Sequence, residues 1–297
     1  MSEPVPPDDE QELLDDPRAS SRSRILGGGA HKTEGLRGVV TALISTVIFF
    51  ALVFYVVVHS PNWEAVKDQF FDPVIFKESF PLVLRAFWTN IVAFMEAEVF
   101  ILIFALVLAV MRSLRGPVFF PIRALAVVYV DLFRGVPTIL VIVLFAFGIP
   151  GLQIPGVPNS AFFWGVVSLV LVYSAYVAEV YRAGIDSVHE SQVSAARSLG
   201  LSRWQSMRHV VLPQAIRRVI PPLLNDFIGL QKDTALLAIV GVIEAFRVSG
   251  IEVARTFDYT PYLVTALLFI AITIPLARFT DYLIARGRRR RMAGGAA

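Results

Sequence analysis

Long apolar runs alternate with shorter polar segments along most of the chain. A helix needs roughly 20 apolar residues to cross the hydrocarbon core of a bilayer. Six runs of about that length or longer occur, at about residues 38–58, 87–111, 119–148, 161–185, 219–245 and 261–285. They predict an all-α membrane protein, a six-span helical bundle. Residues 59–85 mix charged and aromatic residues, which predicts an extracytoplasmic amphipathic segment.

The two ends of the chain are polar. Residues 1–37 are rich in proline, first acidic and then basic, and predict a disordered cytoplasmic tail. The first apolar run begins too late for a cleaved signal peptide, and no basic region precedes it at the start. Residues 286–297 form a basic tail that contains RGRRRR. Such a tail could bind nucleic acid, but beside a span it is expected to contact membrane lipid headgroups instead.

Lysine and arginine are unevenly distributed between the two sets of inter-span segments. The set of segments that includes both tails and residues 186–213 holds roughly three times as many lysines and arginines as the other set. Basic residues are retained on the cytoplasmic side, so the pattern places both termini in the cytoplasm of a multi-pass protein. An even number of spans agrees with that orientation.

Composition narrows the possible chemistry. Hydrophobic residues make up 56% of the 297, cysteine is absent, and the four histidines form no ligand pattern. Disulfides, iron–sulfur clusters and thiolate metal sites are therefore excluded. The chain carries no G-x-x-x-x-G-K-[ST] phosphate loop, nucleophile elbow or H-E-x-x-H motif. We expect no bound cofactor and no enzymatic site, so active transport would take its energy from an ion gradient or from a partner.

The longest polar interruption is residues 186–213, DSVHESQVSAARSLGLSRWQSMRHVVLP. Gly200 is suited to a left-handed helix stop, and Ser202 with Gln205 forms an S-x-x-Q capping box for a second helix. Pro213 marks where that second helix must yield or bend. Ala195, Ala196 and Leu199 predict a low-relief apolar face that fits a groove on another protein. A solvated linker or a helix packed under the bundle would explain the same pattern.

Charged residues also lie inside the apolar runs, where each costs roughly 2.5–3.5 kcal/mol to insert. Asp131 with Arg134, and Glu179 with Arg182, are three residues apart, so the two members of each pair can share a helix face. Glu96 and Glu98, in contrast, cannot both face the interior. Gly135 and Pro137, which follow Arg134 closely in the sequence, predict an interrupted helix next to a cavity. Structural pairing and contact with a translocated polar solute both remain possible for these candidates, which are Glu96, Asp131, Arg134, Glu179, Arg182, Lys232 and Asp233.

SAARSLGLSRWQSMRHVVLPQA resembles the cytoplasmic E-A-A-x-x-x-G-x(9)-I-x-L-P loop of bacterial ABC-importer permeases. YVDLFRGVPTIL, AYVAEVYRAGI and NDFIGLQKDTALLAIVGV resemble further motifs of the polar-amino-acid branch, the histidine, glutamine and glutamate permease-like family. The likeness covers roughly residues 85–285 and leaves the first span outside the shared core. Ser194 replaces the acidic residue of the motif, which puts a charge-assisted contact with the ATPase in doubt.

This resemblance implies a type I ABC importer transmembrane domain, with a five-span core at 86–285 and an extra N-terminal span, in a bacterial cell membrane. ATP and magnesium would be bound by partner ABC ATPase subunits. A second permease subunit, identical or related, and an extracytoplasmic amino-acid-binding protein would complete the assembly. The coupling residues implied are Ser194, Ala195, Ala196, Leu199, Gly200, Leu212 and Pro213.

The sequence analysis therefore predicts the permease subunit of an ATP-driven importer for polar amino acids, with glutamate or glutamine chosen by overall likeness only. An ion-gradient-driven secondary transporter that uses the buried charges directly is the alternative. An intramembrane enzyme has no recognisable catalytic set to support it.

Overall fold

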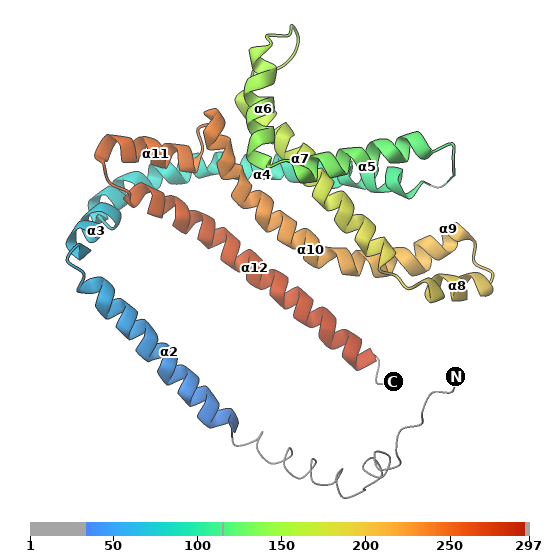
Figure 1. Cartoon of the computed structure of the whole chain (residues 1–297), viewed down its shortest axis with the longest axis horizontal. Coiled ribbons are helices and arrows are strands. Elements are labelled where there is room, and N and C mark those ends of the chain that lie inside the picture. The colour runs from blue at the N-terminus through green and yellow to red at the C-terminus, as the bar shows by residue number, and fades with distance from the viewer. Residues whose placement is uncertain (1–33, 115, 295–297) are drawn as a thin grey trace, which may run out of the picture. The chain divides into compact units, whose positions relative to one another are not determined.

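The computed structural model describes residues 34–114 and 116–294, and all of their regular elements are helices (Figure 1). The predicted tail at residues 1–33 lies outside the described residues. The elements are α2 (Glu34–Val58), α3 (Trp63–Phe70), α4 (Pro73–Ser113), α5 (Phe120–Gly135), α6 (Thr138–Gly151), α7 (Ala161–Asp186), α8 (Glu190–Ser198), α9 (Arg203–Ser206), the π-helical segment η2 (Met207–Val211), α10 (Leu212–Asp233), the 3₁₀-helix η3 (Thr234–Val240), α11 (Ala245–Thr256) and α12 (Thr260–Gly294).

The apolar runs correspond to helices of membrane-spanning length. Four described helical stretches, Gly38–Val58, Trp63–Ser113, Ala161–Asp186 and Thr260–Arg286, are long and apolar enough to cross a bilayer. Two bent pairs bring the count to six if each pair is one span. The all-helical membrane class is confirmed, and the predicted set of six apolar runs corresponds to these four helices and two broken spans.

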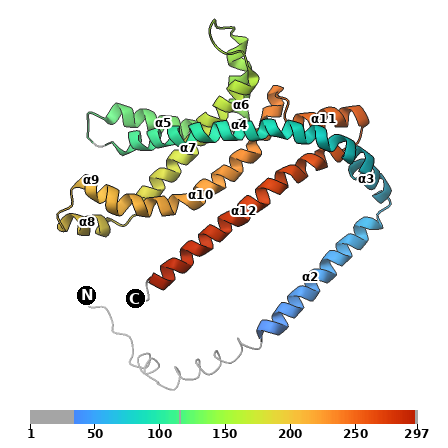
Figure 2. The ribbon, with the colours of Figure 1, turned by 180° about the vertical axis from the view of Figure 1, so that it is seen from behind.

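The third predicted span is broken where the sequence indicated. α5 ends at Gly135, α6 begins at Thr138, and the two helices meet at 102°. Pro137 has no N–H to donate and forces the preceding residue out of the helical region. Val136 accordingly adopts φ −100° and ψ 134°. In both ribbon views α6 leaves the line of α5 at a steep angle (Figure 2).

Two elements differ in extent from the sequence-based expectation. α4 begins at Pro73 and runs for 41 residues, so the second half of the predicted surface segment 59–85 is helix continuous with the second span. Asp72 caps α4 by accepting hydrogen bonds from the N–H groups of Val74 and Ile75. At the other end of the chain, the backbone of α12 stays helical through Gly294, beyond the expected boundary at 286.

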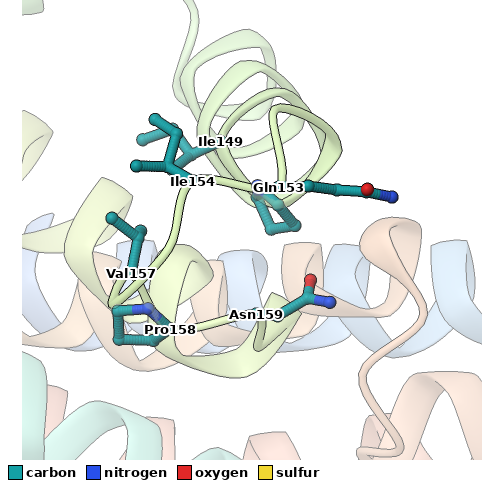
Figure 3. A pocket seen from close by; sticks show the side chains of 7 residues that line it. Ile149, Gln153, Ile154, Val157, Pro158 and Asn159 are labelled. Carbon is teal, nitrogen blue, oxygen red and sulfur yellow. The ribbon is translucent and has the colours of Figure 1, made fainter.

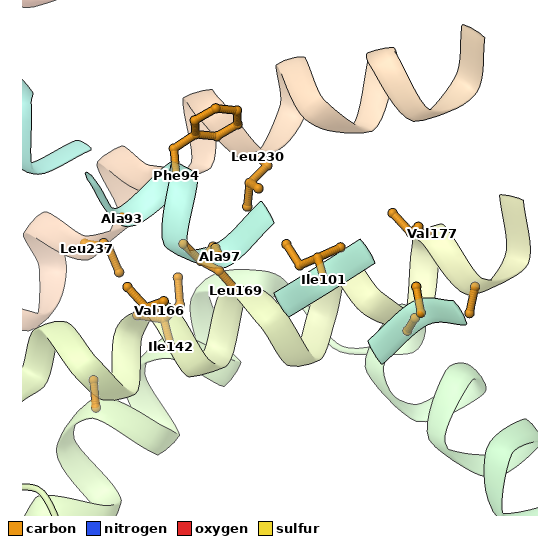
Figure 4. Packing of buried hydrophobic residues seen from close by; sticks show 14 of the residues in the cluster. Ala93, Phe94, Ala97, Ile101, Ile142, Val166, Leu169, Val177, Leu230 and Leu237 are labelled. Atoms are coloured by element: carbon orange, nitrogen blue, oxygen red, sulfur yellow. The ribbon is translucent and has the colours of Figure 1, made fainter. Parts of the chain in front are cut away.

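The core of residues 66–297 is built around α7, which packs against α4, α5, α6 and α10. Small residues let the helix backbones approach closely, as membrane bundles require. Ala93, Ala97 and Leu169 are fully or almost fully buried in the central cluster (Figure 4). The protein divides into two units at Ala65, and α2 belongs to the first, where its large apolar side chains from Val39 to Val57 are exposed.

Candidate functional site

The loop between α7 and α10 folds as helix, glycine turn and helix. At the end of α8, the Leu201 N–H donates to the Ala196 carbonyl at 3.2 Å, and the Gly200 N–H donates to the Arg197 carbonyl at 3.0 Å. These two bonds form a Schellman motif, which needs a left-handed residue at its turn. Gly200 supplies it with φ +87°. The left-handed stop expected from the sequence is therefore present.

The second helix of the loop starts and bends as its sequence indicates. Ser202 and Gln205 form the reciprocal capping box, with the Ser202 N–H 2.8 Å from Gln205 Oε1. The helix then widens into the π-helical segment η2 before Pro213. Pro213 cannot donate to the carbonyl four residues earlier, and its ring would clash there. The wider turn of η2 relieves both problems without ending the helix.

The exposed surface of the loop is only partly the predicted one. Leu199 and Trp204 project from the turn with 82% and 70% of their surface exposed. Ser194 and Ala195 are also exposed, whereas Ala196 turns inward and is 6% exposed. The apolar face expected from Ala195, Ala196 and Leu199 is therefore divided between two sides of α8. Leu212 and Pro213 are exposed at the start of α10.

The loop with α8 and α9 lies at the ends of α7 and α10 (Figure 2), and several contacts connect it to α10. Gln214 Nε2 on α10 donates to Gln192 Oε1 on α8 at 2.5 Å. Arg218 donates to the Ser187 carbonyl. Gly184 lies so close to α10 that an added Cβ would stand 2.1 Å from Val219 Cγ1. These contacts join α8 and the end of α7 directly to α10.

Glu179 on α7 forms salt bridges with arginines from three helices. Arg112 Nη1 at the end of α4 lies 2.5 Å from Glu179 Oε2, and Arg134 Nη1 of α5 lies 3.9 Å from the same oxygen. Arg182, one turn along α7, bonds the other oxygen of Glu179 and also reaches Asp186 at 2.7 Å. The expected pairing of Glu179 with Arg182 is present. Arg112 was missed because no local spacing connects it with α7.

The expected Asp131–Arg134 pair does not form. Arg134 points to Glu179 instead, and among the described residues Asp131 makes no salt bridge and is exposed. Lys232 and Asp233 make no salt bridge within 4.0 Å among the described residues, and Asp233 accepts a hydrogen bond of 2.9 Å from the Tyr173 hydroxyl. Helical geometry turns neighbouring residues about 100° apart, so adjacent opposite charges do not face each other.

The two glutamates of α4 divide as their spacing requires. Glu96 is exposed, whereas Glu98 is half-buried and interacts electrostatically with Asp226 of α10. Glu96 is thus the outward residue, and Glu98 takes the interior position. Asp226 was missed by the sequence analysis, although a lone carboxylate in the apolar stretch of α10 is a usable signal. Its Oδ2 atom is buried without a hydrogen-bond partner.

Two cavities lie away from these charges. The α6–α7 loop encloses about 240 Å³, with Gln153 and Asn159 on one side and Ile154 and Val157 on the other (Figure 3). A groove of about 460 Å³ lies between η3, α11 and α12. No group of three or more histidine, aspartate or glutamate side chains in the described part of the chain could hold a metal ion.

Comparison with known proteins gives consistent matches. Residues 101–289 match the family model described as "Binding-protein-dependent transport system inner membrane component". The chain is 35% identical over 209 residues to the probable glutamine ABC transporter permease protein GlnM of Bacillus subtilis (strain 168), covering 69% of this chain and 93% of that protein. It is 33% identical to the glutamate transport system permease protein GluC of Corynebacterium glutamicum, covering 66% and 90%.

A solved structure, described as an amino acid ABC transporter with histidines, superimposes with a TM-score of 0.67 at 30% identity. The match covers 72% of this chain and 98% of that one. The fold expected for the core is therefore confirmed.

Proposed function

Because the chain belongs to the family of binding-protein-dependent transport system inner membrane components, we propose that it is the permease subunit of an ATP-driven importer of polar amino acids. The relatives named for glutamine and glutamate support that substrate class. Membership also makes the chain a multi-pass bacterial inner-membrane protein of a family whose permease subunits have no ATPase site of their own. The alternative of an ion-gradient-driven carrier has no support.

The observation that carries the proposal is the exposed helix–glycine–helix turn inside the matched region. Leu199 and Trp204 present apolar surface where the turn projects, and the contacts of Gln214 and Arg218 connect the turn to the spans. We place partner ATPases on this turn, with ATP and magnesium bound by them. Their closure would move α8 and α9, and with them α7 and α10, between inward-open and outward-open states.

The remaining partners and the orientation belong to the same proposal. The bias of basic residues puts both termini and the α8–α9 turn in the cytoplasm. An amino-acid-binding protein would then deliver substrate from the opposite side. A second permease, another copy of this chain or a relative, would complete the path. Ser194 cannot make the ionic contact of an acidic residue, so apolar burial would supply most of the docking energy.

The charged residues divide into three groups in this proposal. Glu179, Arg134 and Arg182 are joined by salt bridges and are assigned to structural support of the cytoplasmic ends of the spans. Asp233, Glu98 and Asp226 lack a salt-bridge partner among the described residues and are assigned to the translocation path, together with Lys232. Glu96 and Asp131, both exposed, are candidates for contact with the second permease or with lipid.

Replacement of Gly200 by valine tests the docking turn. A β-branched side chain is strained at φ +87°, so the Schellman turn should be lost. We expect Gly200→Val to insert normally into the membrane, to fail to retain the ATPase on purification and to abolish uptake.

Gly156→Val is the matched control. Gly156 has φ +81° in the α6–α7 loop and, like Gly200, has no atom within 4 Å of an added Cβ. The control should carry comparable backbone strain and keep its ATPase. A Gly200→Val protein that purifies with its ATPase and transports normally would refute the docking role of the turn.

A further inference from the structure

The break between η3 and α11 is held by buried polar side chains that the proposed transport path does not use. The span bends by 50° here, after a 3₁₀-helix and a left-handed Gly241 with φ +85°. Glu244, the last residue before α11, is completely buried. No cation pairs with it among the described side chains, although an uncompensated buried carboxylate is costly.

Hydrogen bonds satisfy the Glu244 carboxylate instead. Its Oε1 accepts from the Arg247 N–H at 2.6 Å, and its Oε2 accepts from the Phe246 N–H at 2.9 Å. These N–H groups belong to the first turn of α11, where the helix dipole also favours negative charge. Oε2 accepts a third bond, of 2.9 Å, from Asn90 Nδ2 on α4. All three contacts use Glu244 as an acceptor only.

Asn90 bonds both sides of the break at once. It is 1% exposed, and its Nδ2 also donates to Thr234 Oγ1, at the start of η3, at 3.2 Å. Its Oδ1 accepts from the Ala245 N–H, at the start of α11, at 3.1 Å. One amide of α4 therefore spans the segment that contains the bend. Thr234 donates in turn to the Gln231 carbonyl at 2.8 Å.

The network continues into α12. Thr273 Oγ1 donates to Gln231 Oε1 at 3.1 Å, and Gln231 is 2% exposed. Segments far apart in the sequence are thus joined by side chains that are buried, except for the half-buried Thr273. A hydrogen bond in such an environment is strong, and loss of one partner leaves the other unsatisfied.

We propose that Asn90 and Glu244 form a clamp that sets the bend of the η3–α11 break and makes this break move with α4 as one body during transport. Both are positioning residues. The clamp explains why a 50° bend persists where no proline interrupts residues 234–244. It goes beyond the proposed function, and its principal test does not require transport.

The test exploits the natural absence of cysteine. Ile243, beside Glu244, is 57% exposed, so Ile243→Cys reports the conformation of the break through its rate of reaction with a water-soluble maleimide in the purified complex. Asn90→Asp would place two carboxylates in contact. Glu244→Gln would turn one of the two acceptor positions into an NH2 donor, which faces either the Asn90 donor or the Arg247 N–H. Either variant should change the labelling rate about tenfold, because an unsatisfied buried polar group shifts such an equilibrium by about that factor.

The double variant Asn90→Asp/Glu244→Gln restores a donor–acceptor pair across the contact, although the Phe246 N–H loses its acceptor. Its labelling rate should return most of the way to that of the Ile243→Cys parent. Glu252→Gln, which removes the α11 carboxylate that pairs with Arg255 of the same helix, is the control and should leave the rate unchanged. ATP hydrolysed per substrate transported, measured in parallel, should rise in the single variants and fall again in the double variant.

If the single variants do not assemble, the amount of assembled complex becomes the readout, and the double variant should accumulate better than either. Single variants with unchanged labelling, or a double variant no better than the singles in labelling or assembly, would overturn the clamp. Unchanged coupling with altered labelling would count against the proposed role in transport while leaving the clamp itself in place.

Discussion

At the residue scale, the burial of Glu179 and its neighbours determines how much each ion pair contributes. The Arg112 side chain is 13% exposed and that of Glu179 is 23% exposed, whereas Arg134 and Arg182 are 41% and 43% exposed. Pairs open to solvent contribute little, but a partly buried arginine left without its counter-ion is costly. Arg112 is therefore the residue that depends most on Glu179.

Glu179→Gln tests this dependence. The variant keeps the shape of the side chain but leaves the arginines of α4, α5 and α7 to repel one another. We expect it to destabilise the protein by about 1–2 kcal/mol, less than a fully buried pair would lose because solvent screens Arg134 and Arg182. Thermal unfolding of the detergent-solubilised protein measures the effect.

Asp281→Asn is the control for the loss of one negative charge. Asp281 pairs with Arg278 at 3.4 Å, and the two side chains are 65% and 80% exposed. Its removal should change stability by less than about 0.5 kcal/mol. Equal effects of the two substitutions would show that burial at Glu179 does not matter.

The charged residues show what local spacing can predict. The i, i+3 spacing identified Glu179 with Arg182, because both lie on one turn of one helix. The same spacing was wrong for Asp131 and Arg134, since a residue of another helix, Glu179, attracts Arg134. The sequence did not identify Asn90 as a candidate, because a single amide in an apolar run carries no charge. Its role depends on partners about 150 residues away.

At the element scale, local chemistry identified one break better than the other. Gly135 and Pro137 predicted the interruption that the structure shows as a 102° bend, because the proline has no N–H to donate and displaces the preceding residue from helical geometry. The bend after Asp233 is supported by Gly241 and by contacts with α4, which only the folded protein brings together. Pro81 lies within α4 without ending it.

The crossing of α7 and α10 depends on Gly184. An added Cβ would come within 2.1 Å of Val219 Cγ1, a distance that real contacts do not reach. Gly184→Ala should therefore push α10 away from α7, lower the unfolding temperature by several degrees and weaken coupling to the ATPase. Val219→Ala removes the offending methyl groups, so the double variant should recover most of the stability.

Gly148→Ala in α6 serves as the control for helix propensity, because no atom lies within 4 Å of its added Cβ. It should be neutral or stabilising by about 0.5–1 kcal/mol. A Gly184→Ala protein as stable as the control would show that the α7–α10 contact is adaptable.

At the scale of the whole molecule, the family match and the first span are separate. The match begins at residue 101, and α2 belongs to a unit of its own in which no residue of its apolar window is buried. A helix that is apolar all round fits a lipid environment. One span added to a five-span core gives an even number of crossings, which agrees with the proposed cytoplasmic placement of both termini.

That arrangement leads to a topological prediction for intact cells. Single cysteines at Ser198, in α8, and at Asn159, in the α6–α7 loop, would both be exposed and lie at opposite ends of α7. Because basic residues keep their segments in the cytoplasm, a membrane-impermeant maleimide should label Asn159→Cys in cells with a permeabilised outer barrier and an intact inner membrane. Ser198→Cys should react only after the inner membrane is opened. The reverse pattern would place the α8–α9 turn outside, where no ATPase could reach it, and would overturn the proposed mechanism together with the orientation.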